Sequence, residues 1–234
     1  MFRGDHADLH RAVNGALVQA RALGHPRTGS EHLLLSLSAS THPVATILHR
    51  YGAAEAALHP AVCAAAPLGA GAAADRETLA PLAIDVDRFL AGLTPSVLDR
   101  PPAREPRLPF GAAKARRHCA RLNPPLGLDS QAAIEASLRL ALARRERDHR
   151  PEHLALTLVA LDPGAAWTLR TAGVDARALL AALRAAFPPP NRNALLRADR
   201  HLGRRSRARD VIRRYQHTTG RAVTTPAALP ALIV

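Results

Sequence analysis

The 234-residue chain has little of several residue types, and each shortage excludes a class of structure. Aromatic residues make up only 3% of it, so the core must be built from alanine, leucine and valine, the first two of which favour helices. Two cysteines, Cys63 and Cys119, provide no disulfide framework and no metal-ligand spacing, and they fit a reducing compartment. No run of about 18 apolar residues occurs, and residues 1–10 lack the apolar core of a signal peptide. We therefore expect a cytoplasmic chain without a membrane span.

The common catalytic and cofactor-binding motifs are also missing. The phosphate-binding loop G-x-x-x-x-G-K-[ST] is absent, because the residues before the only lysine, Lys114, do not form it. H-E-x-x-H, C-x-x-C and G-x-S-x-G do not occur either. His6 and His10 have the spacing of a metal pair on a helix, but without a third ligand nearby we expect an exposed helix face. These absences predict a protein that is not an enzyme and that uses no cofactor and no metal.

Positive charge is abundant, and the formal net charge of +13 predicts attraction to polyanions or acidic surfaces. Much of this charge lies in a predicted helix over residues 193–216, where Tyr215 is the only side chain that could stack on a base. Three interpretations remain open: a solvated helix, docking to an acidic protein surface, and sequence-independent nucleic-acid binding. The candidate phosphate contacts are Arg204, Arg205, Arg207, Arg209, Arg213 and Arg214.

An internal repeat organises the chain. Residues 31–33, Glu-His-Leu, recur as residues 152–154, an offset of 121 residues. The same offset, applied without gaps, also pairs Gly52 with Gly173. Alanine and leucine matches are expected by chance in this composition, whereas the Glu-His-Leu and glycine matches are not. A duplication is therefore the better explanation.

Each copy carries the pattern of four helices. Apolar residues recur at helical spacing over residues 12–20 and 133–141, which predicts the first helix of each copy. Leucine-rich stretches at 32–38 and 153–161 predict a second, short and buried helix. Loops with Pro43 or Pro163-Gly164 precede the third helix, and the fourth is expected around 54–65 and 175–187.

Local residues indicate where some of these helices begin and end. Ser30 is the expected N-cap of the second helix, with Glu31 favourable at its positive end. In the other copy Pro151 suits the first helical turn. Gly52 and Gly173 are suited to end the third helix of each copy, because a left-handed residue often follows a helix.

The fold class that follows is all-α, in four segments. The two repeats cover residues 1–65 and 126–187. Between them, residues 66–125 begin as a Gly/Ala linker, contain one predicted helix at 82–93, and then become rich in proline. After three consecutive prolines, residues 188–234 form the expected basic C-terminal helix and tail.

Residues 20–25, Ala-Arg-Ala-Leu-Gly-His, and 28–35, Thr-Gly-Ser-Glu-His-Leu-Leu-Leu, resemble the "AR..GH..IGTEHLLLGL" signature of the Clp N-terminal repeat. The resemblance covers both copies and is weaker in the second, where Arg150-Pro151 replaces Gly-Ser. Residues 82–87 resemble an insert of actinobacterial stand-alone members, which lack the ATPase modules. The resemblance implies two four-helix repeats related by pseudo-two-fold symmetry that bind proteins and peptides.

In ClpC-type members the glutamate of each Glu-His-Leu motif contacts the guanidinium of a phosphorylated arginine, near a helix N-terminus that receives the phosphate. The resemblance implies this role for Glu31 and Glu152, and Ser30 and His6 are further candidate ligand-binding residues. The alternative is that these glutamates only interact with the helix dipole. Family members start each repeat with Phe-Thr, whereas residues 5–6 are Asp-His here, and a carboxylate at position 5 would repel a phosphate.

The expected function is a non-catalytic accessory of the Clp proteolytic system. The chain would present or sequester substrates, or act as a decoy for cyclic-peptide antibiotics directed at the ClpC N-domain. Its expected partners are ClpC or ClpP components, arginine-phosphorylated proteins, or such peptides. The alternative is a nucleic-acid-associated regulator that uses the basic C-terminal helix.

Overall fold

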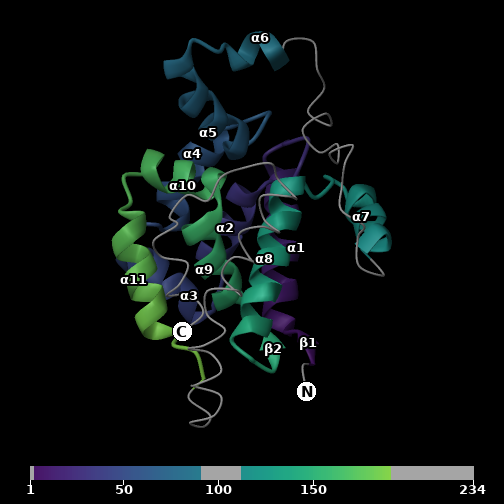
Figure 1. Cartoon of the computed structure of the whole chain (residues 1–234), viewed down its shortest axis with the longest axis vertical. Helices are drawn as coiled ribbons and strands as arrows, with labels where there is room; N and C mark the ends of the chain where they lie inside the picture. Colours follow the sequence, from purple (N-terminus) through teal and green to yellow (C-terminus); the bar gives the residue numbers. More distant parts are fainter. Residues whose placement is uncertain (1–2, 91–111, 191–234) are drawn as a thin grey trace.

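The computed structural model describes residues 3–90 and 112–190, and almost every regular element in these ranges is an α-helix (Figure 1). This confirms the all-α prediction. No helix in the described ranges has the length and apolarity needed to cross a bilayer. The first half contains α1 (Ala7–Ala22), α2 (Ser30–Ser38), α3 (Pro43–Arg50) and α4 (Glu55–Ala64). The second contains α8 (Leu128–Ala143), α9 (Pro151–Leu161), α10 (Pro163–Thr171) and α11 (Ala176–Ala186).

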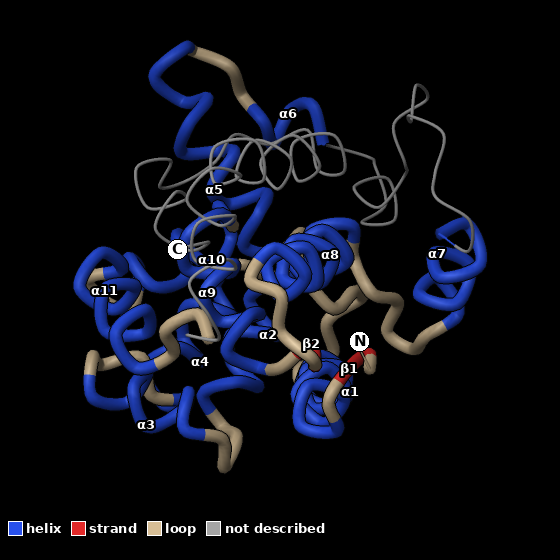
Figure 2. Tube along the Cα trace, turned by 60° about the horizontal axis from the view of Figure 1, so that its bottom comes forward, coloured by secondary structure: helices blue, strands red, loops and turns tan. Residues whose placement is uncertain are grey.

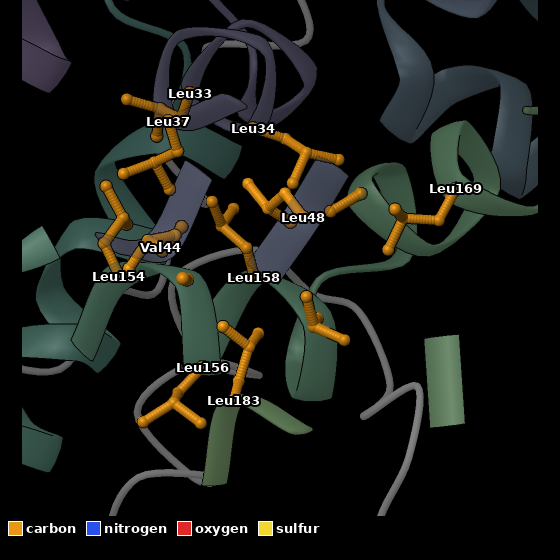
Figure 3. Close-up of a cluster of buried hydrophobic side chains, with 14 of the residues drawn as sticks. Leu33, Leu34, Leu37, Val44, Leu48, Leu154, Leu156, Leu158, Leu169 and Leu183 are labelled. Atoms are coloured by element: carbon orange, nitrogen blue, oxygen red, sulfur yellow. The ribbon is translucent and has the colours of Figure 1, made fainter. Parts of the chain in front are cut away.

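The two halves share one hydrophobic core, with α2 and α9 at its centre. Every residue of these two helices is buried. Figure 3 shows leucine side chains of α2 and α9 in the same cluster as side chains from α3, α10 and α11. Leu33, Leu34, Leu154, Leu156 and Leu158 have no exposed surface at all. Burial of such a side chain stabilises the fold by about 2 kcal/mol, so this pair of helices dominates the packing.

The N-terminus of α2 differs from the prediction in its capping residue. Gly29 is the N-cap and Ser30 is the first helical residue, so the prediction of Ser30 as the cap was wrong. The side chain of His32 replaces the expected cap, because its Nδ1 accepts a hydrogen bond from the Gly29 amide at 3.1 Å. His153 accepts one from the Arg150 amide at 3.0 Å in the same way at the start of α9. Both histidines are buried structural groups.

The predicted ends of α3 and α10 are confirmed. Gly52 has a φ of +82° and Gly173 a φ of +75°, in the left-handed region that glycine adopts at low cost. The amide after each glycine bonds back into the helix, from Ala53 to the Leu48 carbonyl and from Val174 to the Leu169 carbonyl. These bonds satisfy carbonyl groups that a helix end leaves without partners.

Two short parallel pairings tie the halves together. Strand β1 (Gly4–Asp5) pairs with β2 (Asp148–His149), and Thr28 forms an isolated bridge with Leu126. In each case the segment before the first helix of one half lies beside the segment before the second helix of the other half. The offset of 121 residues converts the Asp5–His149 pair into the Leu126–Thr28 pair, with the two halves exchanged.

The segment between the halves contains more helix than predicted. The Gly/Ala stretch, predicted as a linker, is α5 (Ala70–Leu79), whose alanines pack with Trp167 of α10 in a second buried cluster. The helix predicted from Leu82 instead begins later, as α6 (Val86–Leu90), because a 3₁₀ turn (Ala80–Leu82) and a left-handed Ala83 intervene. A further helix, α7 (Ala112–Arg121), precedes the second half. In Figures 1 and 2, α6 and α7 lie at the periphery.

Candidate functional site

Glu31 lies in the first turn of α2 and is almost completely buried, with 1% of its side chain exposed. Its Oε1 is 3.2 Å from Nδ1 of His32, and its Oε2 accepts no hydrogen bond from any side chain or amide that the structure describes. Burial alone would raise the pKa of Glu31, but His32 and the positive charge of Arg27 outweigh it and lower the pKa to about 2. Glu31 is therefore a buried, ionised carboxylate.

The positive charge near Glu31 comes from within the chain. The side chain of Arg27 is 4% exposed; its Nη1 donates to the Leu68 carbonyl at 2.9 Å, and its Nη2 donates to Oδ1 of Asp129 at 2.6 Å. Because Leu68 precedes α5 and Asp129 is in α8, this guanidinium connects three parts of the fold. A buried arginine that is paired with carboxylates and a carbonyl has its charge and its N–H groups compensated.

Three glycines make room for this pair of charges. A Cβ at Gly29 would lie 2.3 Å from Oε1 of Glu31, and one at Gly127 would lie 2.2 Å from Nη2 of Arg27. A Cβ at Gly69 would lie 2.9 Å from Nη1 of Arg27 and 3.1 Å from Oε1 of Glu31. The guanidinium and the carboxylate thus lie on the same side of Gly69, in a space that only glycine leaves open.

Helix α5 and its neighbours cover this site. Ser30 is fully buried, and its hydroxyl donates to Oδ1 of Asp162 at 2.6 Å. A Cβ at Gly164 would lie 2.9 Å from the amide nitrogen of Gly71 in α5 and 2.9 Å from Oγ of Ser30. The backbone of α5 therefore approaches α10 directly above the start of α2. Glu31 and Ser30, both predicted as ligand contacts, are enclosed here by the protein itself.

Glu152, the predicted counterpart of Glu31, has a different environment. Its side chain is 11% exposed, and its Oε2 is 3.5 Å from Nε2 of His42 but accepts no hydrogen bond within the described part of the chain. Burial lowers the pKa of His42, so its ring is neutral near pH 7. Phe187 stacks on His42 with ring centroids 6.2 Å apart. Glu152 thus lies beside an uncharged ring rather than beside a buried arginine.

The offset of 121 residues shows how the second site differs from the first. It converts Arg27 into Asp148, and it replaces Gly29 and Gly127 with Arg150 and His6. Asp148 does not face Glu152 as a counter-charge, since it is itself an acid and its Oδ2 is 3.0 Å from Nη2 of Arg3 and 3.3 Å from Nη2 of Arg150. The compact Arg27 arrangement is therefore confined to the first site.

The structure brings His6 to the second site and not to the first. His6 is the N-cap of α1, where its Nδ1 accepts a hydrogen bond from the amide of Asp8, and its side chain is 40% exposed. The charges of Glu152, Asp8, His6 and Arg150 all act on His42. Of the predicted ligand residues, His6 and Glu152 therefore belong to one cluster, and Ser30 and Glu31 belong to another.

A cavity of about 490 Å³ adjoins the second site. Asp8 and His42 lie at its edge, and α1, the end of α2 and the α2–α3 loop form its walls. Oε1 of Gln19, which also lines it, is buried and accepts no hydrogen bond from the residues that the structure places. The cavity and Glu152 together offer acceptors to a ligand that carries N–H groups.

Ser137, His149 and Asp5 form a hydrogen-bonded chain that the sequence did not indicate. Oγ of Ser137 is 2.7 Å from Nε2 of His149, whose Nδ1 is 2.7 Å from Oδ1 of Asp5. The order resembles a nucleophilic triad. However, Ser137 is fully buried within α8, so a substrate could not reach its hydroxyl. The hydrogen bond from His149 lowers the pKa of Asp5, and the chain joins β1 to β2 and α8.

Two further points concern metal binding and the candidate nucleic-acid contacts. Across residues 3–90 and 112–190, no group of three or more His, Cys, Asp or Glu side chains is arranged to hold a metal ion. The predicted basic C-terminal helix and its candidate phosphate contacts lie outside the described residues, which end at residue 190. These are Arg204, Arg205, Arg207, Arg209, Arg213 and Arg214.

The residues that sequence reasoning missed are Arg27, Asp129 and His42. The first two are 102 residues apart, and no local pattern connects them. The offset could have provided a signal, because Asp129 pairs with Asp8, and Arg27 with the opposite charge of Asp148. A charge reversal between two copies marks a place where their environments differ.

Comparison with known proteins found no matching family model, no matching curated protein and no matching solved structure.

Proposed function

We propose that the chain is a binding module of the Clp N-terminal type, with two four-helix repeats related by pseudo-two-fold symmetry and no catalytic activity of its own. It binds proteins that display phosphorylated arginine, or cyclic peptides that compete for the same site. In the cell it acts as a substrate-binding accessory of a ClpC system or as a decoy that sequesters such ligands.

The repeat is supported by the helix boundaries. With the offset of 121 residues, the starts of α1, α2 and α4 fall on the starts of α8, α9 and α11. α3 and α10 match within one residue, and each begins with a proline. The caps at Gly29 and Arg150 use the same histidine geometry. Independent sequences would not be expected to share boundaries, caps and strand pairings at one offset.

The ligand class is supported chiefly by Glu152. Its buried Oε2 has no hydrogen-bond donor in the described chain, and its nearest basic neighbour, His42, is neutral near pH 7. A guanidinium would supply both the donors and the positive charge that are missing. The adjoining N-terminus of α9 and the half-exposed Arg150 suit a phosphate on the same ligand.

A titration of a fluorescently labelled arginine-phosphorylated peptide tests the proposal. Fluorescence anisotropy should rise with protein concentration, and the unphosphorylated peptide should bind at least tenfold more weakly. Glu152→Gln should weaken binding, and Glu55→Gln, an exposed glutamate in the first turn of α4, is the matched control. Equal binding of the two peptides, or no binding of either, would reject phosphoarginine as the ligand.

A further inference from the structure

We infer that the two ligand sites are unequal: Arg27 occupies the Glu31 site as an internal guanidinium, and only the Glu152 site accepts a ligand from outside. This inference rests on the proposed function for the identity of the external ligand. The occupation of the first site by Arg27 is a separate statement about the chain itself, and it can be tested without phosphoarginine.

The contacts of Arg27 are those that a guanidinium ligand would make. Its Nη2 donates to the carboxylate of Asp129, its Nη1 donates to the Leu68 carbonyl, and its charge acts on Glu31. The group lies between Gly69 and Gly127, where a Cβ would approach it to 2.9 Å and 2.2 Å. No external guanidinium can share this space while Arg27 is present.

The enclosure of the site leads to the same conclusion. The side chains of Arg27, Glu31 and Asp129 are each 4% exposed or less. Asp129 belongs to the second half of the chain. Leu68 and Gly69, which immediately precede α5, lie on another side of the site. Removing Arg27 from the site would leave two buried carboxylates without their nearest cation, which is strongly unfavourable.

The second site lacks the buried arginine of this arrangement. The offset replaces Arg27 with Asp148 and Gly127 with His6. Oε2 of each glutamate accepts no hydrogen bond from the described residues, but the charge of a buried arginine acts on Glu31, whereas the basic group within 4 Å of Glu152 is His42. Within the described residues, one repeat thus holds a buried guanidinium near its glutamate and the other does not.

The first arm of the test counts sites on the unaltered full-length chain. Equilibrium dialysis with phosphoarginine should give one bound molecule per chain, a value that Glu31→Gln leaves unchanged and Glu152→Gln abolishes. Two bound molecules, or loss of binding in Glu31→Gln with retention in Glu152→Gln, would overturn the inference. No binding at all would count against the proposed function only, and the second arm would then decide.

The second arm removes the guanidinium of Arg27 by mutation and replaces it with a small guanidinium compound in solution. Arg27→Ala should melt at a lower temperature than the parent, and millimolar ethylguanidinium should raise its melting temperature or restore its fold. Sodium chloride at the same ionic strength should neither raise the melting temperature of Arg27→Ala nor restore its fold. The parent chain should show no such gain, and the double variant Arg27→Ala/Glu31→Gln should gain less than Arg27→Ala.

The outcomes of the two arms are distinct. If Arg27→Ala is as stable as the parent, or if ethylguanidinium fails to stabilise it, Arg27 is not an internal ligand and the inference is wrong. If Arg27→Ala binds two molecules of phosphoarginine where the parent binds one, both the inference and the proposed ligand are supported.

Discussion

Gly24 and Arg145 lie 121 residues apart and end α1 and α8 in the same left-handed conformation, with φ of +69° and +55°. The next amide bonds back to the helix in both, from His25 to the Ala20 carbonyl and from Glu146 to the Ala141 carbonyl. Glycine adopts this conformation freely, whereas an arginine is strained in it. The two helix ends therefore have the same geometry, but glycine suits it and arginine does not.

Arg145→Gly should stabilise the protein by about 1 kcal/mol, because it relieves the left-handed strain at an exposed position. Gly24→Ala is the matched control and should destabilise by about 1 kcal/mol; a Cβ at Gly24 has no neighbour within 4 Å, so the effect would come from the backbone alone. Urea unfolding measures both. A loss of stability in Arg145→Gly would contradict the assignment of this helix end.

The acid stability of the fold should depend on Glu31. Its pKa is about 2 in the folded protein against an ordinary 4.5, so its carboxylate stabilises the fold above pH 4.5 and loses this effect as the pH falls towards 2. Glu31→Gln should lower the free energy of unfolding at pH 6 and flatten its dependence on pH between 5 and 2.

Glu55→Gln provides the control for this pH series, because Glu55 is also in the first turn of a helix but is exposed. Its curve should follow that of the parent. If the two variants gave the same curve, the buried carboxylate of Glu31 would not contribute in the way that its surroundings indicate.

The docking of α5 can be followed through Trp167, the only tryptophan of the chain. Its Nε1 donates to Oε1 of Glu77 in α5 at 2.7 Å. In Gly164→Ala, the added Cβ would meet the Gly71 amide at 2.9 Å and push α5 away from α10. Tryptophan emission should shift to longer wavelength, and overpacking should cost about 1–3 kcal/mol. Thr171→Ala, at an exposed position of α10, should change neither.

Ser137 should contribute to stability and not to hydrolysis. Ser137→Ala leaves Nε2 of His149 buried without its partner, which should cost about 1–3 kcal/mol in thermal or urea unfolding. Ser40→Ala removes a hydroxyl that bonds only within a partly buried turn and should cost less. Hydrolysis of an activated ester that Ser137→Ala abolished would contradict the structural role.

The helices of both halves were predictable because local signals fix their limits. Prolines at the first helical positions and left-handed glycines at the ends act within a few residues, and the apolar spacing identifies the buried faces. The start of α2 was predicted less well. Ser30 has the chemistry of an N-cap, but its hydroxyl bonds Asp162 of the other half, and a histidine performs the capping.

Features that depend on distant residues were not predictable in this way. The alanines of α5 show no alternation of polar and apolar residues, and its first half, residues 70–74, is buried because it meets Trp167 of α10. The enclosure of Glu31 depends on Arg27 and Asp129, which are brought together only by the packing of the two halves. The sequence indicated the two glutamates, but their unequal surroundings come from tertiary structure.

In the proposed function, Glu152 receives the guanidinium of a phosphorylated arginine. Calorimetric titration of the full-length chain with phosphoarginine, in parallel with Glu152→Gln, measures this binding. The parent chain should give measurable heat and the variant at least a tenfold loss of affinity, with arginine alone or phosphate alone binding more weakly. Equal binding by the parent and Glu152→Gln, or no heat with either, would show that Glu152 does not bind phosphoarginine.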